Sequence, residues 1–330
     1  MKLNNTQLLN FVNRIKLKQD SMPKYREQIK NLKEKLQKKI DEDKKTDIKV
    51  TKFVIAGSWA KGPILRHTGE NPIDIDLVLY IEGEDDNIKD DVEKLHDYVV
   101  KYLKDIYPSK ENSDIIADGK TKSIKITFVG TGLEVDIVPV VPVKTPAEYV
   151  WQPERGGGGK YITSVTKQLN FSSERKTKNP SYIPIVRALK WWRNYKELKP
   201  DDSSAGLSSY NIELIVSYLD LTKGLETNIE EGLIRAFKLL SEANFPLISF
   251  SGAINSVPVL TTPIFIADPT NNENNTAKKI DKKLLDEIKK EANDAFESLT
   301  YAQAKNFEGD TIEEWKRVFG PSFNINEEEK

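Results

Sequence analysis

The sequence predicts an α+β protein in which a mixed β-sheet flanked by helices is followed by a helical half. Between residues 51 and 141, short apolar runs without helical periodicity are typical of buried strands. After Asn179-Pro180, apolar residues recur with helical spacing. A chain of 330 residues can bury two cores of ordinary size, so we expect two domains, 1–160 and 161–330.

Composition excludes several kinds of site. The chain has no cysteine, which rules out disulfides, thiolate catalysis and cysteine-based zinc sites. The two histidines, His67 in a polar loop and His96 in a charged helix, are expected at the surface. No apolar run approaches the ~18 residues of a membrane span, and no secretory signal is visible, so we expect a cytoplasmic protein without a membrane partner.

The first 52 residues carry the basic excess and predict two helices. The first is capped by Asn5 or Thr6 and ends near Asp20. The second is capped by Ser21, with one apolar stripe formed by Tyr25, Ile29, Leu32, Leu36 and Ile40 and a Lys-rich outer face in water. Because the formal net charge is −1, composition predicts no obligatory nucleic-acid partner.

Two aspartates stand on one predicted strand. In Ile73–Ile81 nearly every residue is apolar except Asp74 and Asp76, and because a strand alternates its side chains, both carboxylates point the same way. Just upstream, Gly57 and Ser58 follow the apolar run 51–56, and a Gly-Ser turn lets N–H groups and a hydroxyl approach an anion.

A third aspartate lies in a second predicted strand. Asp136 is alone among apolar neighbours in 133–141, which forms a hairpin with 123–129. A helix over 88–107 covers the sheet. Three buried carboxylates on adjacent strands need a cation such as Mg²⁺, and they suit a two-metal site. The alternative is that they cap or solvate their strands.

The run of four glycines, Gly156–Gly159, breaks this pattern. It lacks the ending of a Walker phosphate loop. Two interpretations remain open, a flexible linker between the domains and a lid over a nucleotide cleft.

The helical half begins after Pro180. Its expected helices cover 183–195, 208–221, 229–243 and 278–304, and a last helix opens with a capping box at Thr311–Glu314 and stops at Gly320-Pro321. Asp268 and Pro269 are expected in a polar turn without a catalytic role. The acidic tail after Phe323 is expected to be disordered.

Taken together, Gly57-Ser58, Asp74-x-Asp76 and Asp136 resemble the signature of the nucleotidyltransferases of the polymerase β superfamily. The resemblance implies a polymerase β-type core in which the three aspartates are catalytic and bind two Mg²⁺ ions, with Mn²⁺ as the alternative. It also implies that Gly57 and Ser58 bind nucleotide.

Motifs in the helical half are similar to one branch of that superfamily. Lys190 in ALKWW and Ser209-Tyr210 in GLSSYNIE resemble the lysine and Ser-Tyr pair with which oligoadenylate synthases, cyclic GMP-AMP synthase and their bacterial relatives hold a nucleotide. FIADPTNNENN (265–275) and WKRVFGPSF (315–323) are similar to motifs of the bacterial cGAS/DncV-like nucleotidyltransferases, or CD-NTases. From periodicity alone, Lys190 would be a surface lysine and Tyr210 a core aromatic.

The resemblance implies an oligoadenylate synthase-like helical domain after the core, and a synthase of cyclic di- or trinucleotides in antiphage defence. Its substrates would be nucleoside triphosphates, ATP among them, and a regulatory protein or activator is left open. The alternatives are a tRNA or RNA 3′-end nucleotidyltransferase and a linear oligoadenylate synthase. The tRNA-tailing enzyme would need a broad basic surface for many backbone phosphates.

Overall fold

A computed structural model describes residues 1–46, 48–66, 72–82, 94–111, 114–116, 122–154, 159–198 and 206–327. Its chain divides into two compact units, one of residues 17–62 and 66–169 and the other of residues 1–16, 63–65 and 170–330. We call the first the sheet unit and the second the helical unit. They differ from the expected domains 1–160 and 161–330 in three places, because residues 1–16 and 63–65 belong to the helical unit and residues 161–169 belong to the sheet unit.

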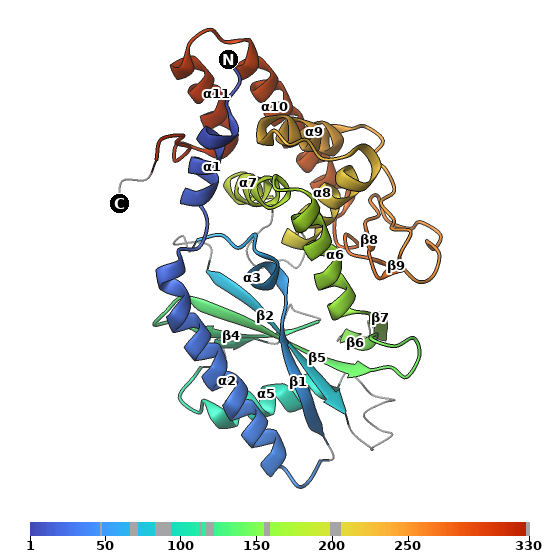
Figure 1. Ribbon diagram of the computed structural model, residues 1–330. Coiled ribbons are helices and arrows are strands. Elements are labelled where there is room, and N and C mark those ends of the chain that lie inside the picture. The colour runs from blue at the N-terminus through green and yellow to red at the C-terminus, as the bar shows by residue number, and fades with distance from the viewer. Residues whose placement is uncertain are drawn as a thin grey trace. The chain divides into compact units, whose positions relative to one another are not determined.

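Among the described residues, the sheet unit contains a seven-stranded sheet, of which Figure 1 labels every strand except β3. Its strands are β1 Lys49–Ile55, β2 Ile73–Glu82, β3 Ile115–Ile116, β4 Ile124–Phe128, β5 Leu133–Pro142, β6 Val150–Glu154 and β7 Gly159–Thr163. The order is β1-β2-β5-β4-β3, and β6 pairs with both β5 and β7. Since β2 and β5 run parallel and the other pairs are antiparallel, the sheet is mixed, which confirms the predicted class.

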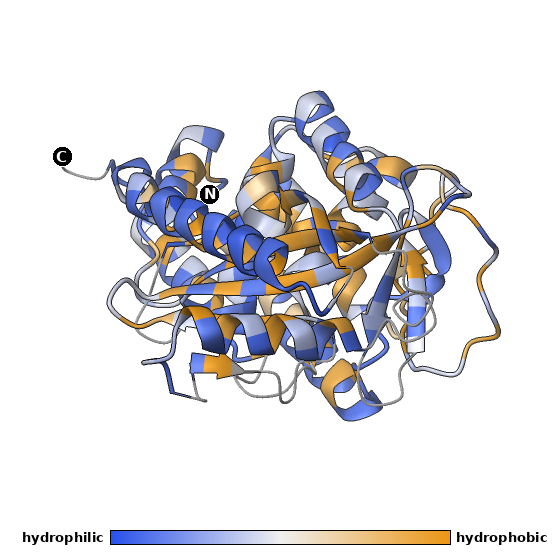
Figure 2. Ribbon diagram, turned by 90° about the horizontal axis from the view of Figure 1, so that it is seen from below, coloured by the Kyte–Doolittle hydropathy of each residue, from blue (hydrophilic) through white to orange (hydrophobic). Residues whose placement is uncertain are grey.

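Two helices of this unit, α2 Met22–Glu42 and α5 Lys94–Ile106, contact each other and the sheet. The predicted stripe from Tyr25 to Ile40 is buried, so α2 packs as its periodicity indicated. Hydrophobic residues concentrate along the strands (Figure 2). His96 was expected at the surface but is fully buried in α5, because it shares a helical face with Val99 and Leu103. His67 lies outside the described residues.

The described residues on both sides of the Gly156–Gly159 run belong to the sheet unit. Strands β6 and β7 pair antiparallel from Val150↔Thr163 to Glu154↔Gly159, and β6 continues onto β5. Residues 155–158 lie outside the described part of the chain, so the two interpretations of this run, a linker and a lid, both stay predictions.

The helical unit contains α1 Asn5–Arg14, most of α6 Val165–Lys178, α7 Tyr182–Tyr195, α8 Ser209–Lys223, α9 Ile229–Ser241, α10 Lys282–Ala304 and α11 Glu308–Phe319. A short hairpin, β8 Ala267–Asp268 and β9 Asn271–Asn275, precedes α10. Asp268 accepts hydrogen bonds from the backbone and hydroxyl of Thr270, which confirms the expected turn.

Several predicted helix limits were wrong. Helix α1 is capped by Asn4 rather than Asn5 or Thr6, and it ends at Arg14 rather than near Asp20. Helix α10 begins after Asp281, whose side chain accepts from the Leu284 N–H. Helix α11 begins at Glu308, so buried Thr311 lies inside it and donates to the Phe307 carbonyl instead of opening a capping box.

The beginning of the C-terminal tail is packed rather than disordered. Ile325 is buried, and its carbonyl accepts a hydrogen bond from Asn10 at 2.8 Å. The next residue accepts at its carbonyl from Arg14 at 2.9 Å. These contacts tie residues 325 and 326 to helix α1, and residues 328–330 lie outside the described chain.

Candidate active site

The parallel register of β2 and β5 brings the three predicted aspartates onto neighbouring strands. Asp76 lies directly opposite Asp136, and Asp74 lies opposite Glu134. Along β2, the alternate residues Ile73, Ile75 and Leu77 are buried, so Asp74 and Asp76 share the opposite face. The predicted common orientation of the two carboxylates agrees with this alternation.

The three carboxylates differ in burial. Asp136 is 7% exposed, whereas Asp76 is half-buried and Asp74 is exposed. The expectation of three buried aspartates was therefore wrong for Asp74. Ile73 and Ile75, on either side of Asp74, are buried on the opposite face, so it is the face of β2 that carries the aspartates that is open at Asp74.

Gly57 lies against the carboxylate of Asp76. Its φ of +60° is in the left-handed region, and a Cβ at this position would stand 1.7 Å from Oδ2 of Asp76. The Ala56 N–H donates to the Asp76 carbonyl at 2.9 Å, which fixes the two segments together. Only glycine leaves room for this carboxylate.

The expected Gly-Ser turn is the start of a short helix, α3 Gly57–Lys61. Ser58 is half-buried, and its carbonyl accepts from the Gly62 N–H at 3.0 Å. Gly57 and Ser58 thus lie beside the start of β2, and their contact with a nucleotide stays a prediction.

The donor chemistry of this face suits a divalent cation, since carboxylate oxygens are the ligands that Mg²⁺ prefers. Asp76 and Asp136 present them from opposed positions, and the space at Gly57 accommodates one of the two groups. Within the described residues, however, no three acidic or imidazole groups gather closely enough to hold one ion. The ligand set of Asp74, Asp76 and Asp136 therefore stays a prediction.

In the helical unit, Lys190 is a buried residue of α7. Its side chain is 4% exposed, and Nζ donates to the Pro63 carbonyl at 3.1 Å. The alternative of a surface lysine is therefore wrong. The contact with Pro63 gives Lys190 a structural role whether or not it also contacts phosphate.

Ser209 and Tyr210 form the first turn of α8. Ser208 caps this helix through a reciprocal capping box with Asn211. Tyr210 is half-buried and packs against the core of the helical unit. This packing supports the alternative interpretation, in which Tyr210 is an aromatic residue of the core. Ser209 is half-buried at the helix start.

Arg193 is a cation beside Ser209 that the sequence reasoning missed. Its guanidinium donates to the Leu207 carbonyl at 2.7 Å and to Ser209 Oγ at 3.4 Å. Burial lowers the pKa of Arg193 to about 10. Arg193 follows Lys190 by three residues, so the two side chains lie on the same face of α7. This spacing was the signal in the sequence from which Arg193 could have been predicted.

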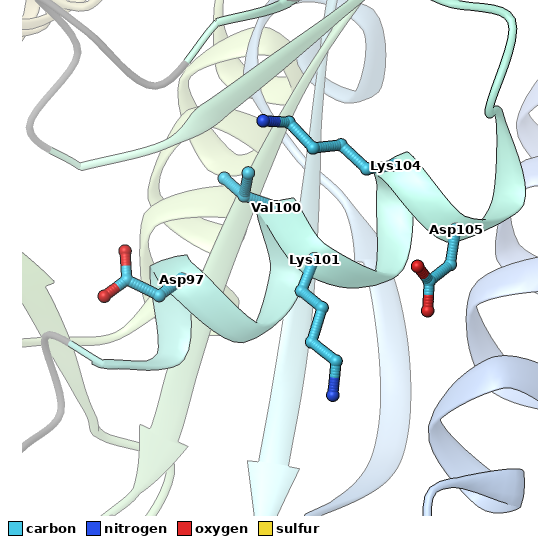
Figure 3. Close-up of a pocket in the computed structure, with 5 residues that line it drawn as sticks. All are labelled: Asp97, Val100, Lys101, Lys104 and Asp105. Carbon is cyan, nitrogen blue, oxygen red and sulfur yellow. The ribbon is translucent and has the colours of Figure 1, made fainter.

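An open pocket elsewhere in the sheet unit does not include any predicted site residue. Figure 3 shows that its lining side chains, Asp97, Val100, Lys101, Lys104 and Asp105, all project from α5. Among the described residues, no helix has the length and hydrophobicity that crossing a bilayer requires.

Comparison with known proteins identifies the family. A model described as "Second Messenger Oligonucleotide or Dinucleotide Synthetase domain" matches residues 1–179. The CBASS oligonucleotide cyclase CdnC of Escherichia coli strain KTE188 is 32% identical over 98% of this chain and 99% of its own length. A cyclic AMP-AMP-AMP synthase of E. coli strain MS 115-1 is 30% identical over 94% of each chain.

Solved structures agree with these relatives. E. coli MS115-1 CdnC with ATP superposes with a TM-score of 0.79 at 28% identity, covering 98% of this chain and 99% of that one. The same CdnC in complex with HORMA-deltaN gives 0.76 at 27% identity over 98% of each. The relatives fit the expected cyclase and not the tRNA-tailing alternative. The chain therefore belongs to the Second Messenger Oligonucleotide or Dinucleotide Synthetase family of bacterial cGAS/DncV-like nucleotidyltransferases, with their polymerase β-type fold.

Proposed function

We propose that this protein joins nucleoside triphosphates into a cyclic di- or trinucleotide, releases pyrophosphate, and signals in antiphage defence. The observation that carries the proposal is the opposed pair Asp76 and Asp136, with Gly57 against one of them, in a chain that aligns end to end with oligonucleotide cyclases. The name of the cyclic AMP-AMP-AMP synthase favours ATP as a substrate and a trinucleotide as the product.

The proposed catalytic residues are Asp74, Asp76 and Asp136, which would bind two Mg²⁺ ions or Mn²⁺ in their place. When bound, such ions neutralise the charge that develops as a hydroxyl attacks the α-phosphate and pyrophosphate leaves. The chain contributes the placement of the oxygens. Burial holds Asp136 in one orientation, and the backbone contact of Ala56 holds Asp76 against Gly57.

Four further residues are proposed to bind the nucleotide. Ser58 would donate its hydroxyl to a phosphate oxygen, and Lys190 would add a positive charge. Tyr210 would offer a ring face to a base, and Ser209 a hydroxyl whose position is fixed by Arg193.

The proposed partner is a HORMA-domain protein, because the CdnC of E. coli MS115-1 is found in complex with HORMA-deltaN. We propose that the protein acts in the cytoplasm, where nucleoside triphosphates are available. The near-neutral charge, −1 over the whole chain, supports a nucleotide substrate without an obligatory nucleic acid.

The test is incubation of the purified protein with labelled ATP, GTP, CTP and UTP and Mg²⁺, with and without a HORMA-domain protein. We expect a phosphatase-resistant product whose mass is that of a cyclic oligonucleotide. Asp136→Asn is the matched control, because it keeps the side-chain shape and removes the charge. A product that phosphatase degrades completely, from every mixture, would contradict cyclisation.

A further inference from the structure

A lysine and a fourth carboxylate lie on the same sheet face as the three aspartates. In the antiparallel pair of β4 and β5, Lys125 lies opposite Asp136, and Asp136 in turn lies opposite Asp76 on β2. One row across three strands therefore reads Asp76, Asp136, Lys125. Residues directly opposite in neighbouring strands project from the same face, so the lysine stands beside the proposed metal ligands.

The adjacent row brings in the fourth carboxylate. Glu134 is two residues before Asp136 on β5 and lies opposite Asp74 on β2. Lys125 forms an ion pair with Glu134, and the two side chains are 21% and 16% exposed. The lysine thus reaches back from its own row to the carboxylate that neighbours Asp74.

This arrangement addresses a problem of charge. Four carboxylates on adjacent positions of two strands repel one another, and each is a suitable oxygen ligand for a divalent cation. Without a counterion, Glu134 would compete for the ions that Asp74 and Asp136 are to position. A lysine paired with it removes both its charge and its donor oxygen from the set.

We propose that Lys125 is a positioning residue that holds Glu134 out of the metal-ligand set, so that the aspartates alone orient the ions. The inference rests on the proposed function of these aspartates. It assigns to Lys125 and Glu134 the charge balance of the site. Mutation of groups that hydrogen-bond metal ligands typically costs about 10- to 100-fold in metal affinity, which sets the scale of the changes expected here, and the sign of each change follows from charge.

The experiment measures Mn²⁺ binding to the full chain by calorimetry without nucleotide, together with the melting temperature in EDTA. Lys125→Met adds one net negative charge and releases Glu134, so we expect Mn²⁺ to bind about tenfold more tightly. Glu134→Gln leaves the lysine beside Asp136, so binding should weaken by a similar factor. The double variant should return close to wild type, and Lys125→Arg should also stay close to it.

The matched control is Lys39→Met, which removes a lysine of another ion pair in the same unit, 3.1 Å from Asp105 between α2 and α5. It should leave Mn²⁺ affinity unchanged. If Lys125→Met lowers the melting temperature and leaves Mn²⁺ affinity within twofold of wild type, the pair is only structural and the inference is overturned.

A further variant separates this inference from the proposed function. Asp136→Asn should weaken Mn²⁺ binding. If it does and Lys125→Met changes nothing, only the positioning role fails. If Asp136→Asn binds Mn²⁺ as wild type does, the metal assignment fails and the role of Lys125 is overturned with it.

Discussion

Replacing Gly57 by alanine tests whether the position of Asp76 matters for catalysis. The added Cβ would stand 1.7 Å from Oδ2 of Asp76, and ordinary contacts of this kind begin near 3.4 Å. The carboxylate must therefore move by about 1.7 Å, or the backbone must shift. Because misplacing a reacting group by about 1 Å can cost ~100-fold in rate, we expect turnover to fall by at least about 100-fold.

The substitution also has a cost in stability. A non-glycine residue at φ +60° is strained by about 1–2 kcal/mol, which corresponds to a fall of a few degrees in melting temperature. The assay compares the initial rate of pyrophosphate release with the melting temperature. This separates a displaced carboxylate from a weakened fold.

Gly224→Ala is the matched control for strain. Gly224 has a φ of +70° and ends helix α8, and a Cβ added there would meet no neighbouring atom within 4 Å. Because its ψ of 141° lies outside the left-handed helical well, the control should lose at least as much stability and still keep its rate within about threefold of wild type. The reasoning is refuted if Gly57→Ala retains the wild-type rate, or if the control loses as much activity.

Three further outcomes are expected. Asp136→Asn should lower turnover by about 100-fold or more while the melting temperature in EDTA stays equal or rises, since it removes one of several like charges; a near-normal rate would contradict its role. Lys190→Met should raise the Kd of a nonhydrolysable ATP analogue by about tenfold in calorimetry, and it should also lower stability because the hydrogen bond to Pro63 is lost. Lower stability with an unchanged Kd would show that Lys190 has only the structural role. Burial, with a smaller contribution from Asp43, raises the pKa of Tyr102 to about 12. The stability that comes from its neutral form is therefore complete below pH ~10 and is lost as the pH rises toward 12. Tyr102→Phe should reduce this loss when the melting temperature is measured at alkaline pH, and an unchanged pH dependence would refute the prediction.

Where local periodicity and packing agreed, the fold could be predicted. The stripe of α2 and the strands around Asp76 and Asp136 are buried as their patterns indicated, because one face of each element must leave water. No helix was predicted over α6, because this segment has few apolar residues. Its buried residues include the polar side chains of Ser172 and Arg175, which give no hydrophobic periodicity. Propensity alone does not report such tertiary support.

Errors at individual residues came from neighbours distant in the chain. The charged residues around His96 in the sequence predicted that it would be exposed, but in the folded protein it is buried. Periodicity predicted that Lys190 would lie at the surface, but it is buried and donates a hydrogen bond to the carbonyl of Pro63, which is more than a hundred residues earlier in the chain. Asp74 is exposed although its neighbours Ile73 and Ile75 are buried, because the segments that cover each face of β2 are distant in the chain.

The sequence by itself determined which residue types carry the chemistry and on which strands they stand, because alternation along a strand is a local property. Motif resemblance extended this to the family, which the comparisons confirmed. Only the tertiary structure decided which groups meet: Gly57 with Asp76, and Lys125 with Glu134 beside Asp136. These neighbours depend on strand register and on the course of the chain between strands, and both are set by the packing of the whole sheet rather than by any one segment.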